Sequence, residues 1–249
     1  MAEFVIKNAK ILYGGIDLSG DMNEVAVTHA AEMIDKTVFG SSGRRKIAGL
    51  KDFQVTGGGF YNASSTQKND PHLFSQIGTT GGILTISQNS SLGAICYSAA
   101  NVLGEYSPGG SVGQMMGFNF ACYGDGNGVR AQIVEAGTGL STALSATPKN
   151  LGKCATTQRL YCINQSQALS SSGGTHTIRV RVQADSSSGF GISLTTLIKM
   201  SAVDWSTRRI SAEMKSTAPG TTDEWFRVRI DSSGSTNSKM TGYIALGIQ

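Results

Sequence analysis

Four arginines at alternating positions are the residues of this chain best placed to bind a charged partner. Arg179 and Arg181 lie in the segment THTIRVRVQA, and Arg227 and Arg229 lie in WFRVRID. Because strand side chains point alternately to two faces, the arginines of each segment should point outward, and the four would form one basic face if their strands are neighbours on one sheet. The opposite, buried face would then carry Ile178, Val180, Val182, Phe226, Val228 and Ile230. Guanidinium groups bind carboxylates and phosphates, so the face would either contact an anionic partner or remain a solvated sheet surface.

A second group of cations ends a loop that is rich in glycine and serine. The segment Phe39–Lys46 (FGSSGRRK) closes with Arg44, Arg45 and Lys46. Its composition predicts an exposed, flexible loop. These three cations are therefore candidates for contacts with carboxylates of another subunit.

Catalytic and metal-binding patterns are missing from the sequence. His29, His72 and His176 fall in three separate segments, and none has a partner at the spacing of a metal site or a catalytic triad. The four cysteines form no C-x-x-C pair, and no Walker A or G-x-S-x-G motif occurs. We expect no enzymatic activity, no metal and no cofactor. A secretory signal peptide is not expected either, since the N-terminal residues lack a charged start followed by an apolar run.

The composition favours an all-β protein that belongs to an assembly. The 249 residues include 32 glycines and 4 prolines, and only 15% of them are charged. About 25% is usual in soluble domains, so much of the surface could be hidden against other subunits. Residues 1–150 hold 10 Lys and Arg against 11 Asp and Glu, whereas residues 151–249 hold 11 against 6. The basic excess therefore lies in the C-terminal part.

Hydrophobic patterning predicts strands throughout the chain and one short helix. The helix is expected over Asp70–Gly78, with Asp70 as its cap, Pro71 in its first turn and Gly78 at its end. Three consecutive glycines within the strand Leu50–Tyr61 indicate a bulge or a close backbone approach. The dipeptide Asn127-Gly128 predicts a hairpin turn between two strands.

The pattern also divides the chain into two domains. The small, polar segment of residues 137–152 resembles a linker. It would join an N-terminal β-domain of residues 1–136 to a C-terminal β-sandwich of residues 153–249. On this reading the two domains should be separable.

Several motifs resemble those of the major tail, or tail-tube, proteins of long-tailed bacteriophages. The first is Gly15-Ile16-Asp17-Leu18-Ser19-Gly20, followed by the basic loop and by Ile47-Ala48-Gly49-Leu50-Lys51. The second is Gly109-Gly110-Ser111-Val112-Gly113, followed by Phe118-Asn119-Phe120, which is similar to a hairpin of the same group. Near the C-terminus, Thr222-Asp223-Glu224-Trp225-Phe226-Arg227-Val228 and Ala245-Leu246-Gly247-Ile248-Gln249 resemble an additional β-domain of phage tail proteins.

This resemblance implies a structural role in a virion. The N-terminal domain would be a tail-tube-like β-barrel or sandwich whose copies form hexameric rings. The rings would stack into a tube, in contact with other tail proteins, and DNA would pass through it without specific binding. Arg44, Arg45 and Lys46 would contact the next ring, and the C-terminal domain would lie outside the tube. Assembly would take place in the cytoplasm of the bacterial host.

A second interpretation is a binding module. The chain could be a tail-tip, fibre or capsid-decoration protein whose C-terminal sandwich recognises glycans of the host surface. The arginine face fits this interpretation as well as it fits a contact between subunits.

Overall fold

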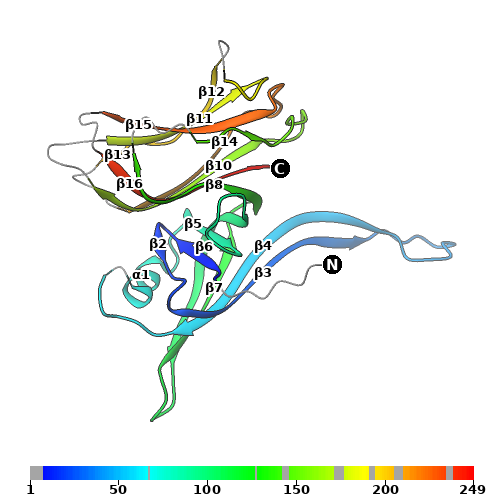
Figure 1. The fold of residues 1–249 in the computed structure, drawn as a ribbon. Coiled ribbons are helices and arrows are strands. Elements are labelled where there is room, and N and C mark those ends of the chain that lie inside the picture. Colours follow the sequence, from blue (N-terminus) through cyan, green and yellow to red (C-terminus); the bar gives the residue numbers. More distant parts are fainter. Residues whose placement is uncertain are drawn as a thin grey trace. The chain divides into compact units, whose positions relative to one another are not determined.

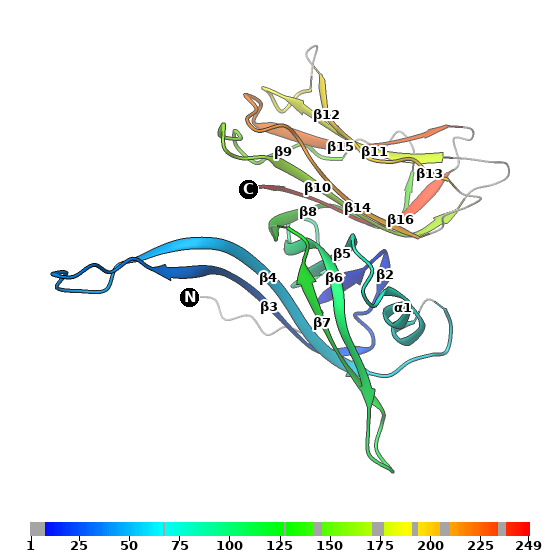
Figure 2. The same ribbon diagram turned by 180° about the vertical axis from the view of Figure 1, so that it is seen from behind.

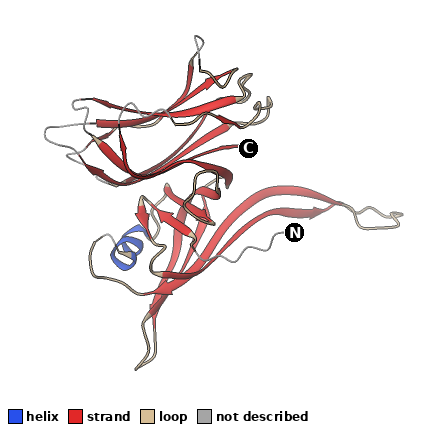
Figure 3. Cartoon of the chain, in the orientation of Figure 1, coloured by secondary structure: helices blue, strands red, loops and turns tan. Residues whose placement is uncertain are grey.

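The computed structural model is built from β-strands with one short helix (Figure 3). It describes residues 8–66, 68–126, 128–141, 146–170, 177–190, 194–204, 210–233 and 238–249. The predicted all-β class, with one helix and a C-terminal sandwich, is confirmed. The chain folds into two compact units, one of residues 1–20, 83–98 and 129–249 and the other of residues 21–82 and 99–128.

Unit 1 is a sandwich of two antiparallel sheets (Figure 1). The first sheet has the order β14-β10-β16-β8-β6-β5-β1-β2, and the second has the order β12-β11-β15-β9, with β13 also paired to β11. The strands of the first sheet are β14 (Ser211–Ser216), β10 (Leu160–Ser170), β16 (Lys239–Ile248), β8 (Val129–Ser141), β6 (Ile95–Gly109), β5 (Gly82–Ser87), β1 (Lys10–Tyr13) and β2 (Ile16–Asp17). Those of the second are β12 (Thr195–Lys199), β11 (Thr177–Asp185), β15 (Trp225–Ser233), β9 (Lys149–Asn150) and β13 (Val203–Asp204).

The core of unit 1 comes from the strand alternation that the sequence displays. Alternate apolar side chains of β11 and β15 are buried against those of β10 and β16. The buried set includes Leu160, Cys162, Ile178, Val180, Val182, Phe226, Val228, Ile230, Ile244 and Leu246. The expected core positions of both arginine-bearing strands are therefore confirmed.

The segment expected to be a linker is partly strand. Residues 137–141 belong to β8, where Gly137 pairs with Gly242 and Leu140 pairs with Met240 of β16. Lys149 and Asn150 form β9 beside Trp225, and residues 142–145 lie outside the described residues. Gly137 and Gly139 have φ angles of 140° and 77°, and the pairing shifts register between Met240 and Gly242. The glycines that made this segment resemble a linker therefore belong to an irregular stretch of strand β8.

Unit 2 is a four-stranded antiparallel sheet with the order β3-β4-β7-β6, together with helix α1. Its elements are β3 (Met22–Asp35), β4 (Lys46–Phe60), β7 (Gly117–Gly124), α1 (Asn69–Gln76) and the later part of β6. The predicted helix is confirmed, but Asp70 is not its cap, because Lys68 occupies the N-cap without a side-chain hydrogen bond. Buried Asn69 holds this end instead, accepting from the Asn62 N–H (2.9 Å) and donating to the Phe60 carbonyl (2.8 Å).

The three glycines of β4 mark a close approach of backbones, as the sequence indicated. A Cβ atom on Gly59 would lie 2.1 Å from the carbonyl oxygen of Asp21, and one on Gly58 would lie 2.6 Å from Asn119 Oδ1. A Cβ on Gly57 would lie 2.8 Å from the Phe120 ring. Only glycine lets β4 lie this close to its neighbours on both sides.

The expected hairpin at Asn127-Gly128 is wrong. Strands β7 and β8 do not pair with each other; both pair with β6, β8 along Ile95–Ser98 and β7 along Asn101–Gly109. Asn127 itself is outside the described residues. Gly128 is required by packing, because its Cβ would lie 2.0 Å from the Phe53 ring. Strands β7 and β8 follow each other in the sequence but pair with different stretches of β6.

All four cysteines are free and buried. Burial raises the pKa of Cys96, Cys122 and Cys162 to about 12 and also raises that of Cys154. Because the thiolate is the reactive form, we expect no labelling of the folded protein by a disulfide reagent at pH 8. Four equivalents should react in denaturant. Labelling of even one thiol in the native protein within minutes would contradict this expectation.

Candidate functional site

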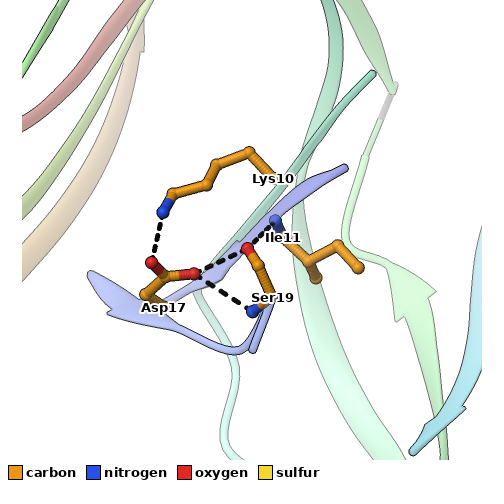
Figure 4. Close-up of polar contacts among 4 residues, drawn as sticks. All are labelled: Lys10, Ile11, Asp17 and Ser19. Atoms are coloured by element: carbon orange, nitrogen blue, oxygen red, sulfur yellow. Dashed lines mark hydrogen bonds and ion pairs between the residues drawn. The ribbon is translucent and has the colours of Figure 1, made fainter. Parts of the chain in front are cut away.

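The Asp17-Leu18-Ser19 motif is a structural turn of unit 1 (Figure 4). The Asp17 carboxylate forms an ion pair with Lys10 and accepts hydrogen bonds from the Ser19 N–H (3.0 Å) and hydroxyl (2.6 Å). The Ser19 hydroxyl in turn accepts from the Ile11 N–H (2.9 Å). Partial burial would raise the pKa of Asp17, but the bonds from Lys10 and Ser19 lower it below its ordinary value. The motif therefore locks β1 to β2 as a charged turn.

A buried glutamine ties the same turn to β10. The Gln165 side chain accepts from the Gly15 N–H (2.8 Å) and donates to the Ile83 carbonyl (3.0 Å) and the Thr85 hydroxyl (2.9 Å). A Cβ on Gly15 would lie 2.7 Å from the Ser166 carbonyl oxygen. Sequence reasoning missed this residue, because nothing local to Gln165 indicates partners about 80 and 150 positions away.

Arg44, Arg45 and Lys46 lie at the end of the long β3–β4 hairpin, as the loop composition suggested. The loop is closed by Thr37, whose N–H donates to Asp35 Oδ1 (2.8 Å) and whose hydroxyl oxygen accepts from the Arg45 N–H (2.9 Å). Lys46 begins β4 opposite Asp35. All three cations are exposed, and their contact with a neighbouring ring remains a prediction.

The outer part of this hairpin also exposes large apolar side chains, which the sequence analysis did not single out. We call residues 30–50 the β3–β4 arm; both views show it leaving the rest of its sheet as a two-stranded ribbon (Figures 1 and 2). Phe39 is 108% exposed and Leu50 is 83% exposed. Val38, Met33, Ile34 and Ile47 are exposed as well. Their signal in the sequence is a run of apolar residues flanking a polar loop.

The β6–β7 hairpin carries a second apolar tip. Val112 is 107% exposed, and Met115 and Met116 are exposed beside it. The resemblance to a phage hairpin pointed to this segment, and the paired strands β6 and β7 confirm that it is a hairpin. Two apolar tips therefore belong to unit 2.

One face of the unit 2 sheet forms a shallow acidic hollow. Across the strands, Ala26 pairs with Thr56, Thr56 with Ala121, and Ala121 with Glu105. The residues that line the hollow also include Glu24, Asn119 and Ser107. Among these described lining residues, Glu24 and Glu105 are the charged groups. Two carboxylates of the N-terminal part, those of Glu24 and Glu105, thus share one surface.

The structure brings the four arginines of unit 1 together on one sheet face. Arg181 lies directly opposite Arg229, Arg179 opposite Asp231, and Arg227 opposite Gln183. Asp231 holds two guanidinium groups, with its Oδ2 2.5 Å from Arg181 Nε and its Oδ1 accepting from Arg229 Nε at 3.0 Å. The sequence contained this signal, since Asp231 continues the alternation of Arg227 and Arg229.

Arg227 is fixed by neutral groups. Its Nε donates to Gln183 Oε1 (3.0 Å), and its guanidinium carbon lies 4.5 Å from the centre of the Phe190 ring. Phe190 is buried and has a φ of 44°, a left-handed conformation that costs a bulky residue energy. The strained backbone thus places the ring under the cation.

The histidines do not form a site among the described residues. His29 packs edge-on against Phe53 at 6.0 Å, His72 lies in α1, and His176 is outside the described residues. The part of the chain that the structure describes contains no group of three or more metal-binding side chains. None of its helices is long and apolar enough to cross a membrane.

No family model and no curated protein matches the chain. Among solved structures, a chain from the virion of a native gene transfer agent particle is 14% identical, with a TM-score of 0.41, and the match covers 52% of this chain and 98% of that one. The Dit protein of phage SPP1, described as a paradigm of the hub adsorption apparatus, is 12% identical, with a TM-score of 0.38 over 98% of this chain and 100% of its own. A baseplate chain of the anti-feeding prophage is 11% identical, with a TM-score of 0.36 over 52% of this chain and 97% of its own. Likeness at these values assigns no function to the chain.

Proposed function

We propose that this protein is a structural subunit of a phage-type tail whose copies close into a ring around a DNA passage. The phage-like motifs around Asp17, Arg44 and Val112 support this proposal, and the β3–β4 arm carries it. On this proposal the rings are hexameric and stack as a tail tube, and residues 153–249 face outward.

The arm requires cover from another chain. Strand β4 pairs with β7 from Gln54 onward, so the outer residues of β3 and β4 pair with each other alone among the described strands. An isolated two-stranded ribbon is marginally stable in water at best. Its unpaired edges also offer free backbone hydrogen-bonding groups to a further strand.

The arm exposes apolar side chains on both of its faces. Ile34 lies opposite Ile47 on one face, whereas Met33 lies opposite Ala48 on the other. A ribbon that lay on the surface of its own subunit would be apolar on one face only. Burial of both faces at once needs a neighbouring copy on each side, which a closed ring supplies.

The acidic hollow suits the channel of such a ring. Glu24 and Glu105 would repel phosphates, and the small side chains around them leave room. A surface that attracts DNA gains affinity with each phosphate it neutralises, so a conduit should lack cations. The hollow meets this requirement among its described lining residues.

A second candidate function is a tail-tip, fibre or decoration protein that binds host glycans. The observation that favours it is the arginine face of unit 1, where Trp225 lies on the same side of β15 as Arg227. A single ring of this protein at the end of a tail would combine ring closure with glycan binding, without stacking into a tube.

Removal of the apolar arm tip should block assembly without unfolding the subunit. We expect the double substitution Val38→Ser and Phe39→Ser to yield monomers at concentrations where the unchanged protein forms rings. Both side chains are exposed, so their replacement should change stability by less than about 0.5 kcal/mol. Light scattering, negative-stain images and a thermal melt measure the two effects.

Leu92→Ser with Leu194→Ser is the matched control, since both leucines are exposed in unit 1.

The triple substitution Arg44→Glu, Arg45→Glu and Lys46→Glu should instead leave single rings intact and prevent their stacking. Monomeric unchanged protein at all concentrations and salt levels would refute the ring. Normal assembly of the arm variant would remove the arm from the interface.

A further inference from the structure

The basic face of unit 1 is arranged in regular levels. We use this name for Arg179, Arg181, Arg227, Arg229 and Lys199, which lie on β11, β15 and β12. Arg179 forms the first level, Arg181 with Arg229 and Lys199 the second, and Arg227 the third. Successive levels are two residues apart along the strands, or about 6.6 Å.

Carboxylates neutralise only part of this charge. Asp231 is shared by Arg181 and Arg229 through their Nε atoms, which leaves the terminal amino groups of both guanidiniums to bind another anion. Asp185 is buried and accepts hydrogen bonds from the Ser187 N–H and from neighbouring hydroxyls. Arg227 and Lys199 form no ion pair among the described residues. Arg181 and Arg229 lie directly opposite each other, and the single charge of Asp231, which bridges them, compensates only one of the two guanidiniums.

We propose that the basic face binds a phosphodiester-linked surface polymer that runs parallel to β11 and β15. An extended chain covers about 3.6 Å for each three bonds, so a phosphodiester repeat of six backbone bonds spans about 7 Å. This repeat matches the spacing of the three levels. Guanidinium groups held by Asp231 and Phe190 lose little freedom on binding, and their planar forks fit phosphate oxygens.

Nucleic acid fits the face less well. Proteins that hold single strands offer successive aromatic platforms along a basic groove. On the described part of this face, Trp225 is the one aromatic residue on the strands that carry the cations. A flat sheet face also inserts nothing into a duplex groove, so duplex DNA would contact it through phosphates alone. The basic face would bind the polymer whether or not the subunits form rings.

The test uses the full-length protein and poly(glycerol phosphate) as the probe. Arg181→Gln with Arg229→Gln should weaken binding by about tenfold or more, because two charge-assisted contacts are lost. The magnitude of the slope of log affinity against log salt should fall by about 1.4 to 1.8. Arg130→Gln with Lys239→Gln removes the same charge from exposed positions on the other sheet and should leave affinity nearly unchanged.

Each other outcome decides against the proposal. Undetectable binding at low salt, an equal loss in the control variant, or equal affinity for polygalacturonate would show that no phosphodiester site exists. Tighter binding of duplex DNA would make the face a nucleic-acid surface. Loss of self-assembly in the Arg181 and Arg229 variant, with polymer binding intact, would make it a subunit contact. If that variant fails to melt cooperatively, Lys199→Gln replaces it, and unchanged polymer binding by a folded Lys199→Gln protein would then overturn the proposal.

Discussion

A chain that ends at Asn150 is expected to lose the fold of unit 1. Strand β8 would keep β6 as a neighbour but lose β16, which pairs with it from Gln132 to Ser141. Val134 and Leu140 would lose the core they share with β11 and β15. Each fully buried Val or Leu side chain contributes about 1.5–3 kcal/mol, whereas a whole domain is stable by about 5–15 kcal/mol. We therefore expect no cooperative thermal transition for unit 1 in circular dichroism.

The matched experiment adds residues 151–249 back as a separate polypeptide. Because unit 1 contains residues 1–20 and 83–98 as well as 129–249, the two pieces should restore the transition when mixed. A truncated chain that melts cooperatively by itself and forms rings would instead support the domain division expected from sequence. In that case the pairing of β8 with β16 would be dispensable.

Strand alternation made much of this fold predictable. The buried positions of β11 and β15 followed from period two. The helix followed from Asp70, Pro71 and Gly78, although Asp70 is not its cap. These features depend on neighbours in sequence, which a pattern can display.

Long-range pairing was not predictable in the same way. Gly137 and Gly139 have the composition of a linker, and their strand conformation depends on β16, about 100 positions later. The Asn127-Gly128 dipeptide signals a local turn, but β6 accepts both flanking strands. In both segments, pairing with a distant strand outweighed the local preference for a loop or a turn.

The candidate surfaces also differ in whether they depend on neighbours in sequence or on the order of distant strands. Alternation predicted that Arg179 with Arg181, and Arg227 with Arg229, lie opposite the buried residues of their strands, and Asp231 follows from the same rule; the pairing of β11 with β15 then brings them onto one face. The acidic hollow was not predicted, since Glu24 and Glu105 meet only through the order β3-β4-β7-β6. Exposed Phe39 was overlooked because an apolar residue in a loop is ordinarily buried against its own chain.

Gly59→Ala is expected to destabilise unit 2 by about 1–3 kcal/mol, the usual range for overpacking, because the new Cβ would lie 2.1 Å from the Asp21 carbonyl oxygen. That oxygen accepts the hydrogen bond of the Phe60 N–H at 2.7 Å, so the strain falls on the backbone where β3 begins and β4 ends, at the base of the hairpin that carries the β3–β4 arm. Amide hydrogen exchange should accelerate in residues 21–60 and stay unchanged in β10 and β16, and ring formation should weaken with it. Gly109→Ala is the control, since Gly109 lies in β6 of the same sheet and a Cβ there meets nothing within 4 Å. Equal amide exchange rates of residues 21–60 in the two variants would contradict the prediction. They would show that the close contact at Gly59 does not stabilise the pairing of β3 with β4, and the arm would then be too loosely anchored to organise a ring.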